Sequence, residues 1–409
     1  MDTRLADFIR DTPQGREAES ILRKCVHCGF CTATCPTYQL LGDELDGPRG
    51  RIYLMKQMLE GEPVTAKTQL HLDRCLTCRS CETTCPSGVR YGRLVEIGRE
   101  VVESRVPRPA SQRARRWLLR KSLLSRPLFG LAAATGRLAR PLLPSSLAAK
   151  LPEARRGAWP EARHGRRMLV LDGCVQPSLA PSVDAATARV LDRIGISLVR
   201  APASGCCGAL SLHLAAVDEA RRLMRANVDA WWPEIERGAE AIVVTASACG
   251  LQLREYGELL RDEPAYAERA ARIAALARDP VEIVLPEWDR LSPLLAADRD
   301  ARRVAFHAPC TLLHGLKLAG RVEEALRALG FELTPVADAH LCCGSAGTYA
   351  ILQPELSQRL RANKLAALEG GSPDVIATAN IGCLLQLASG TRRPVRHWIE
   401  LLEARLRRG

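Results

Sequence analysis

The sequence predicts an α+β multidomain protein, in which a helical N-terminal part precedes a duplicated α/β module. Three observations support this fold class. Eight cysteines form two copies of the pattern C-x2-C-x2-C-x3-C-P before residue 87. From residue 168 onward, short apolar runs such as 168–171, 196–199 and 242–244 alternate with helical stretches, which is typical of parallel sheets covered by helices. Eight further cysteines recur at matched intervals in that half and indicate an internal repeat.

The doubled N-terminal motif is the signature of a protein that holds two [4Fe–4S] clusters. In two-cluster ferredoxins, the first three cysteines of a motif bind one cluster and the fourth binds the other. We therefore expect two ligand sets: Cys25, Cys28, Cys31 and Cys85 for cluster 1, and Cys75, Cys78, Cys81 and Cys35 for cluster 2. Zinc sites usually show cysteine pairs rather than triplets followed by C-P. Disulfides are not favoured either, because they require an oxidising compartment and the N-terminus shows no secretory signal.

Five segments are expected along the chain. They are a helical lead-in (1–20), a helical ferredoxin-like domain with two [4Fe–4S] clusters (21–94), a basic connector (95–167) and two cysteine-rich repeats (168–290 and 291–409). Inside the ferredoxin-like domain, residues 46–50 are expected to form a turn and residues 52–59 a helix. Seven prolines in the connector predict that its helices are short.

The net charge of +12 is concentrated in the connector. Residues 105–167 contain sixteen Lys or Arg and only two acids. Mixed with its apolar clusters, this charge suits an anionic membrane surface or an acidic partner face. Nucleic acid is not expected as a partner, because the segment has only three aromatic residues and no binding motif. No apolar run is long enough to span a membrane and the N-terminus resembles no signal peptide, so we expect a cytoplasmic protein.

Each C-terminal repeat contains four cysteines at matched spacing. One cysteine lies 32 residues before a Cys-Cys-Gly sequence, and a fourth follows it in both copies. The two expected sites, either metal-binding or made of buried structural thiols, are Cys174, Cys206, Cys207 and Cys249, and Cys310, Cys342, Cys343 and Cys383. Nearby side chains that could orient a cluster, relay a proton or contact a quinone are His213, Tyr349, His307 and His314, although a structural role is favoured for each histidine.

Several stretches resemble the iron–sulfur subunit of bacterial glycolate oxidase (glycolate dehydrogenase). They are LRKCVHCGFCTATCPTYQLLGDELDGPRGRIYLMKQML, HLDRCLTCRSCETTCPSGVRYG, GCVQPSL, GCCGAL and HAPCTLLHG. The resemblance implies electron transfer from flavin (FAD) subunits, which oxidise glycolate to glyoxylate, toward a membrane quinone. It also implies a peripheral position on the inner face of the cell membrane. The repeats resemble the cysteine-rich (CCG) domains of heterodisulfide reductase.

One departure from the heterodisulfide reductase pattern limits that second resemblance. There each repeat ends in C-x-x-C and five cysteines hold a non-cubane cluster, whereas here Ala246 and Asn380 replace the first cysteine of that pair. A four-ligand cluster and a degenerate site near a quinone both remain open.

No catalytic residue is expected in this chain. It contains no dinucleotide fingerprint, P-loop or nucleophile elbow, so substrate chemistry is expected on a partner. The alternatives are the iron–sulfur subunit of a D-lactate or glycerol-3-phosphate dehydrogenase, or a catalytic reductase like heterodisulfide reductase.

Overall fold

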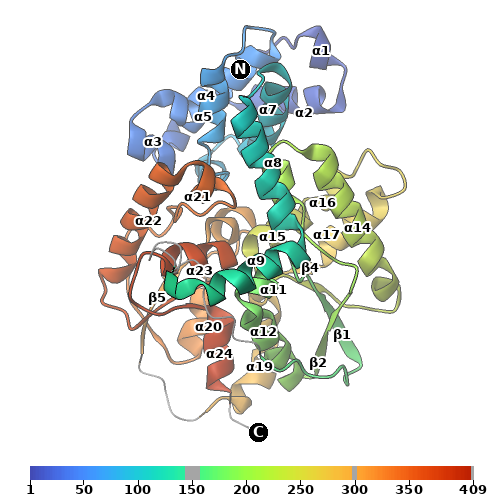
Figure 1. Ribbon diagram of the computed structural model, residues 1–409, viewed down its shortest axis with the longest axis vertical. Coiled ribbons are helices and arrows are strands. Elements are labelled where there is room, and N and C mark those ends of the chain that lie inside the picture. The colour runs from blue at the N-terminus through green and yellow to red at the C-terminus, as the bar shows by residue number, and fades with distance from the viewer. Residues whose placement is uncertain (143–156, 297–301, 407–409) are drawn as a thin grey trace.

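The computed structural model describes residues 1–142, 157–296 and 302–406. A helical N-terminal domain lies above two α/β units in Figure 1, and the connector helices run down the front of the molecule. The predicted α+β class and the duplication of the α/β module are confirmed.

The N-terminal domain is built from short helices around one apolar core. Its core includes Leu22, Met55, Leu59 and Leu94, none of which has measurable exposure. The helices are α1 (Asp7–Arg10), α2 (Pro13–Lys24), α3 (Pro36–Leu41), α4 (Pro48–Leu59), α5 (Ala66–Asp73), α6 (Ser80–Thr84) and α7 (Tyr91–Arg105), with short turns η1 (Phe30–Thr32) and η2 (Glu44–Asp46).

Two details of this domain differ from expectation. The turn expected at 46–50 is wrong in its second half, because α4 already begins at Pro48, whose fixed φ suits the first helical turn. Helices α2 and α7 also continue through the segment boundaries expected at residues 20 and 94. Ile9 of the expected lead-in is buried in the same core as Met55 of the ferredoxin-like domain. The division of the chain into five segments therefore stays a prediction, with helices continuing through two of its boundaries.

The connector forms two substantial helices, α8 (Ala110–Leu124) and α9 (Arg126–Leu138), followed by η3 (Arg140–Leu142). The expectation of short helices is wrong here, since they contain 15 and 13 residues. Pro109 and Pro127 lie at the two helix starts, where a missing N–H breaks no helical hydrogen bond. Pro144 and Pro152 belong to the basic stretch that lies outside the described residues.

The two α/β units contain parallel sheets of the same topology. The first has strand order β2-β1-β3-β4 and the second β6-β5-β7-β8, so each strand has a counterpart at the same place in the other sheet. The strands are β1 (Arg166–Val170), β2 (Ile196–Arg200), β3 (Ile242–Val243), β4 (Ala277–Arg278), β5 (Arg303–His307), β6 (Glu332–Leu333), β7 (Val375–Thr378) and β8 (Val395–His397).

Helices cover both sheets, and the two units share one core. Val243 of the first unit and Phe306 and Trp398 of the second belong to the same buried cluster. The first unit contains α11 (Gln176–Leu179), α12 (Pro181–Arg193), α13 (Ala209–His213), α14 (Val217–Glu236), α15 (Ser247–Arg254), α16 (Tyr256–Leu259), α17 (Ala267–Leu276), α18 (Val281–Val284), α19 (Trp288–Leu291) and η4 (Ser292–Leu294). The second contains η5 (Thr311–Gly315), α20 (Arg321–Ala328), α21 (Tyr349–Leu352), α22 (Pro354–Glu369), α23 (Ile381–Ala388) and α24 (Trp398–Arg405).

Polar contacts hold the N-terminal domain on both units. Arg79 forms an ion pair of 2.5 Å with Glu255 in the first unit. Thr83 shares a hydrogen bond of 2.9 Å with His314 in the second unit. Among the helices that the structure describes, none combines the length and apolar character needed to cross a bilayer.

Candidate metal centres

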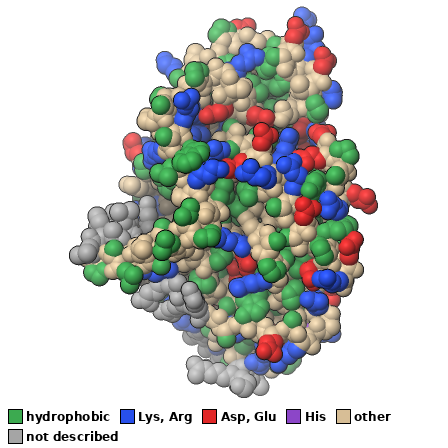
Figure 2. All heavy atoms as spheres, turned by 45° about the vertical axis from the view of Figure 1, so that its right-hand side comes forward, with side chains coloured by type: hydrophobic (Ala, Val, Ile, Leu, Met, Phe, Trp, Pro, Cys, Tyr) green, Lys and Arg blue, Asp and Glu red, His purple; other side chains and the backbone are tan. Residues whose placement is uncertain are grey.

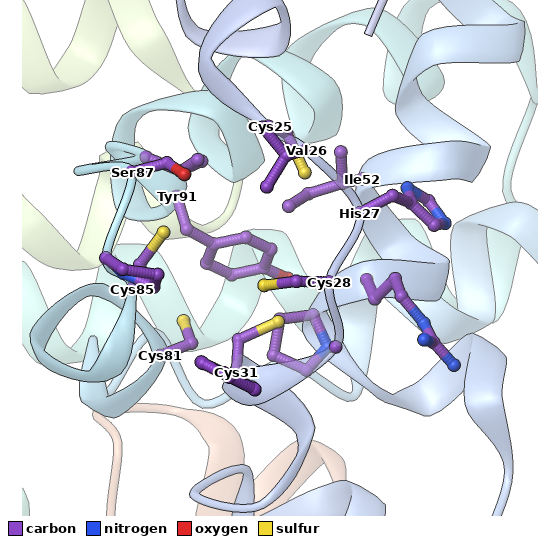
Figure 3. Close-up of a pocket in the computed structure, with 16 residues that line it drawn as sticks. Cys25, Val26, His27, Cys28, Cys31, Ile52, Cys81, Cys85, Ser87 and Tyr91 are labelled. Atoms are coloured by element: carbon purple, nitrogen blue, oxygen red, sulfur yellow. The ribbon is translucent and has the colours of Figure 1, made fainter.

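The first group of thiols gathers at the ends of two helices. Cys25 directly follows α2 and Cys85 directly follows α6, while Cys28 and Cys31 lie in the loop around η1. In Figure 3 their sulfur atoms point into one space beside the ring of Tyr91. Burial raises the pKa of Cys31 to about 11, with smaller contributions from the other three thiols. These four cysteines are the set expected for cluster 1.

The second group forms a neighbouring site that Tyr91 also lines. Cys35 caps the start of α3, and it lines one pocket with Cys75, Cys78 and Cys81. Burial raises the pKa of Cys81 well above its usual value, and the other three thiols raise it further. These are the four cysteines expected for cluster 2, although Cys81 also borders the first pocket.

The two cysteine loops share an unusual backbone conformation. His27 and Gly29 have φ of 59° and 88°, and Thr77 and Arg79 at the equivalent positions have φ of 54° and 61°. Residues other than glycine rarely adopt this left-handed region, and such strain is found mainly at functional sites. The repeated turns bring successive thiols of each motif to one centre.

The two thiol groups differ in their distance from solvent. Cys28 of the first group is the one exposed cysteine among the sixteen. Beside it, Val26 and Phe30 have exposed fractions of 68% and 62%. In the second group Cys35, Cys75 and Cys81 are buried. The first group therefore lies at the surface, and the second lies between the N-terminal domain and the α/β units.

Buried arginines near the second group were missed by the sequence analysis. Although burial raises the pKa of Cys75, the positive charges of Arg51 and Arg99 lower it overall, and the Tyr91 hydroxyl donates to its sulfur at 3.6 Å. The thiolate is the form that binds metal. The sequence did contain a signal for such a buried arginine. Arg51 lies four residues before Met55, so the pattern places a charge on the apolar face of the helix.

The donor chemistry of both groups fits iron–sulfur clusters. Eight thiols stand as two groups of four, and hydrogen-bond donors and positive charge surround the second group. Cubane clusters require four thiolates and are tuned by such hydrogen bonds and charges. The assignment of each cysteine to a cluster nevertheless stays a prediction.

In the first repeat, the four expected cysteines follow three neighbouring strands. Cys174 follows β1, Cys206 and Cys207 follow β2, and Cys249 lies in α15 after β3. A hydrogen bond with Cys206, together with burial, raises the pKa of Cys174. For Cys207, a hydrogen bond with Cys206 lowers the pKa, but one with Cys249 and burial raise it well above the usual value. The thiols thus form a continuous chain of contacts at the carboxyl ends of the strands.

The second repeat has the same arrangement and one further ligand-type side chain. The Sγ atoms of Cys310 and Cys342 are 3.9 Å apart. A ring nitrogen of His307 and the Sγ atoms of Cys343 and Cys383 all lie within 4.8 Å of one another. Burial, then the charge of Lys364, lowers the pKa of His307 to about 3, so its imidazole is neutral at physiological pH.

The remaining side chains singled out from the sequence have different surroundings. His314 bonds Thr83 through Nδ1 and the carbonyl of His340 at 3.1 Å through Nε2, so it ties the N-terminal domain to the second unit. His213 lies 3.9 Å from Glu96, and burial lowers its pKa to about 3. Tyr349 is buried, and its hydroxyl has no hydrogen-bond partner among the described residues.

The two residues that stand in place of the first C-x-x-C cysteine of heterodisulfide reductase also have different surroundings. Ala246 is a buried apolar residue before α15. Asn380 donates from Nδ2 to the sulfur of Cys383 at 3.4 Å. Neither residue supplies a fifth thiol to its repeat.

Comparison with known proteins decides the family. A 4Fe-4S dicluster domain matches residues 21–89, and a cysteine-rich domain matches residues 168–254 and again 304–388. The glycolate oxidase iron-sulfur subunit of Escherichia coli (strain K12) is 55% identical over 409 residues, which is 99% of both chains. This chain belongs to the glycolate oxidase iron-sulfur subunit family. The resemblance inferred from the motifs is confirmed, as is the expectation of an iron–sulfur protein.

More distant relatives extend this picture. A probable glycolate oxidase iron-sulfur subunit of Bacillus subtilis (strain 168) is 32% identical and covers 94% of this chain and 92% of its own. Lactate utilization protein A of Bacillus licheniformis is 27% identical over 244 residues, which is 57% of this chain and 97% of that protein.

Proposed function

We propose that this member of the glycolate oxidase iron-sulfur subunit family carries electrons from a flavin subunit that oxidises glycolate toward a membrane quinone. The observation that carries the proposal is 55% identity over the full length to the Escherichia coli subunit. The bound [4Fe–4S] clusters would supply one-electron transfer. The chain lacks a dinucleotide fingerprint, which agrees with glycolate oxidation on a partner.

The cysteines of the two motifs are proposed to bind the clusters crosswise. Cys85 joins the first motif, and Cys35 joins the second. The neighbours of two central thiols support this exchange: those of Cys31 include Cys85, and those of Cys81 include Cys35. The hydroxyl of Thr84 also donates to that of Thr34 at 3.2 Å, and these threonines directly precede Cys85 and Cys35, so the ends of the two motifs are in contact.

The flavin partner is proposed to contact the surface around Cys28. This is the exposed edge of the first thiol group, and the side chains of Val26 and Phe30 project beside it. Tyr53, with an exposed fraction of 46%, adds a third apolar contact on this face. Small apolar surfaces next to a redox group suit the modest interfaces of electron-transfer partners.

A peripheral contact with the inner face of the cell membrane is proposed for helices α8 and α9. Their exposed apolar side chains are Trp117, Leu118, Leu128, Leu131 and Leu138. Much of the positive charge on and just before these helices is used in ion pairs within the chain. Arg108 and Arg116 pair with Asp73, and Arg120 and Lys121 pair with Glu219. Figure 2 likewise shows Lys and Arg interspersed with Asp and Glu on the face it presents. The exposed apolar side chains of α8 and α9 are therefore proposed, rather than their basic residues, to anchor the contact.

The test is reduction of this chain by glycolate. The chain is mixed anaerobically with its flavin subunits, and glycolate is added while the visible iron–sulfur absorbance is followed. We expect bleaching with the flavin subunits and none with this chain alone. Bleaching by D-lactate but not by glycolate would instead assign the chain to the lactate alternative. Turnover of glycolate by the isolated, flavin-free chain would overturn the division of labour.

A further inference from the structure

His307 is a buried side chain whose surroundings fit a ligand to a metal. It ends strand β5, is 1% exposed, and neither ring nitrogen has a hydrogen-bond partner among the described residues. A buried imidazole without partners loses the hydrogen bonds that water gave it, which is unfavourable unless another group binds its nitrogen. A ring nitrogen instead faces the sulfurs of Cys343 and Cys383, with all three ligand atoms within 4.8 Å of one another.

We propose that His307, Cys343 and Cys383 bind a single zinc ion in the second repeat. The three ligands come from the end of β5, the Cys-Cys-Gly turn and helix α23, which are distant in sequence. Sulfur and imidazole are the donors that zinc prefers in tetrahedral sites. The inference goes beyond the proposed electron transfer and does not depend on it.

The spacing of the ligand atoms favours one ion. Ligands bound at 2.0–2.3 Å to one tetrahedral ion lie about 3.5–3.8 Å apart, so atoms already within 4.8 Å need only a small closure. Thiolates on different irons of a cubane lie farther apart. The separation of the three ligand atoms, which lie within 4.8 Å of one another, therefore fits a single ion better than a cluster.

The charge of the site also favours zinc. One Zn²⁺ with two thiolates and a neutral imidazole has no net charge, which suits three ligands that are all buried. Zinc undergoes no redox change, so the ion would hold the three segments together rather than carry electrons.

The first repeat provides an internal control, because it has no counterpart of this histidine. His307 precedes Cys310 by three residues, and the residue three before Cys174 is the buried Leu171. The repeats share sheet order and cysteine spacing, so a leucine is sterically acceptable at this position of the fold. The zinc site is therefore confined to the second repeat.

The test is the zinc content of the full chain, purified anaerobically and measured by elemental analysis. We expect about one zinc per chain in addition to cluster iron. His307→Leu, which installs the side chain of the first repeat, and Cys383→Ser should each lower zinc at least tenfold. Cys249→Ser, the matched change in the first repeat, should leave zinc unchanged. His307→Cys should retain it, because a thiolate replaces the imidazole as ligand.

Zinc X-ray absorption of the unmodified chain provides a readout that does not depend on the folding of a variant. We expect one nitrogen at about 2.0 Å together with sulfur at about 2.3 Å. An unmodified chain without zinc would overturn the proposal, and so would a shell of sulfur alone. The same holds for zinc that survives His307→Leu, or for iron in the second repeat in place of zinc. Iron–sulfur absorbance of the N-terminal domain reports whether each variant is folded.

Discussion

Arg51 and Asp46 form an ion pair that is almost completely removed from solvent, with Nη2 and Oδ1 3.2 Å apart and exposed fractions of 1% and 0%. The pair lies beneath the second thiol group. Arg51 also donates to the hydroxyl of Thr37 at 3.1 Å, and that hydroxyl lies 3.3 Å from the sulfur of Cys35. One buried guanidinium thus connects the core of the N-terminal domain to a cluster ligand.

The first prediction is that Arg51→Met both destabilises the domain and alters one cluster. Asp46 keeps its ion pair with Arg74 at 2.7 Å, but the buried carbonyl of His71 loses its donor and the buried carboxylate loses one of its cations, which together cost on the order of 3 kcal/mol. Loss of positive charge beside Cys35 and Cys75 should also make reduction of cluster 2 harder and lower its midpoint potential. Thermal unfolding and an EPR-monitored redox titration measure the two effects.

Arg49→Met is the matched control for this change. Arg49 pairs with Glu44 at 2.6 Å, but the two side chains are 35% and 40% exposed. Solvent screens such pairs, so the expected loss of stability is below about 1 kcal/mol. If Arg51→Met and Arg49→Met have equal effects on stability and on the potential of cluster 2, the buried pair does not have the role assigned to it.

The second prediction concerns the exposed edge of the first thiol group. Val26→Ser combined with Phe30→Ser should weaken binding of the flavin subunits and slow glycolate-dependent reduction about tenfold, the effect of losing one well-packed contact. Reduction by dithionite should be unchanged, because the thiols are untouched. Leu45→Ser removes a similarly apolar but less exposed side chain elsewhere on the domain and serves as the control. An unchanged rate of glycolate-dependent reduction would place the partner elsewhere.

The sequence predicted the elements that depend on local signals. The cysteine spacing within each motif is set by the ligand geometry of one loop, so the two motifs could be recognised in advance. The exchange of Cys35 and Cys85 between them stays a prediction. Three apolar runs were expected at 168–171, 196–199 and 242–244, and they form β1, β2 and β3 within two residues. The repeated cysteine spacing predicted the duplicated sheet, because an internal sequence repeat indicates two copies of one structural unit.

What the sequence did not reveal depends on contacts between distant positions. Arg51 donates to the carbonyl of His71 only after α4 and α5 pack together. His307 was noticed only as a flank of Cys310, and its approach to Cys383 depends on the pairing of β5 with β7. The basic connector was expected to suit an anionic membrane surface or an acidic partner face. Composition could not foresee that Arg116 pairs with Asp73 of the same chain.

A third prediction follows from the buried carboxyl group of Asp279. Burial raises its pKa to about 7, one oxygen accepts from the N–H of Val281 at 3.0 Å, and the other has no partner among the described residues. In the unfolded chain this group titrates near pH 4. Between about pH 4 and about pH 7 the unfolded chain therefore binds fewer protons than the folded one, and stability falls as pH rises.

Asp279→Asn should remove this loss. The stability of the variant relative to the unmodified chain should therefore increase from pH 5 to pH 8, as measured by thermal unfolding. Asp289→Asn changes an exposed carboxyl group and should show no such trend. A difference between Asp279→Asn and the unmodified chain that stays constant with pH would contradict the assignment.

A fourth prediction addresses the membrane contact of α9. The triple change Leu128→Ser, Leu131→Ser and Leu138→Ser removes side chains with exposed fractions of 58%, 65% and 84%, so little packing is lost. Binding of the complex to phosphatidylglycerol vesicles should fall, because interfacial helices bind through buried apolar area. Sedimentation with the vesicles measures it. Undiminished sedimentation of the triple variant would show that α9 is not the anchor.

The central claim is that the two motifs exchange their fourth cysteines, and paired substitutions test it without prior assignment of the EPR signals. If ligation is crossed, Cys28→Ser with Cys85→Ser damages one cluster and leaves the other intact. Cys78→Ser with Cys85→Ser then damages both. EPR of the dithionite-reduced chain should accordingly show one unperturbed [4Fe–4S] signal in the first double variant and none in the second. The reverse result, with both clusters lost in the first variant and one retained in the second, would contradict the account.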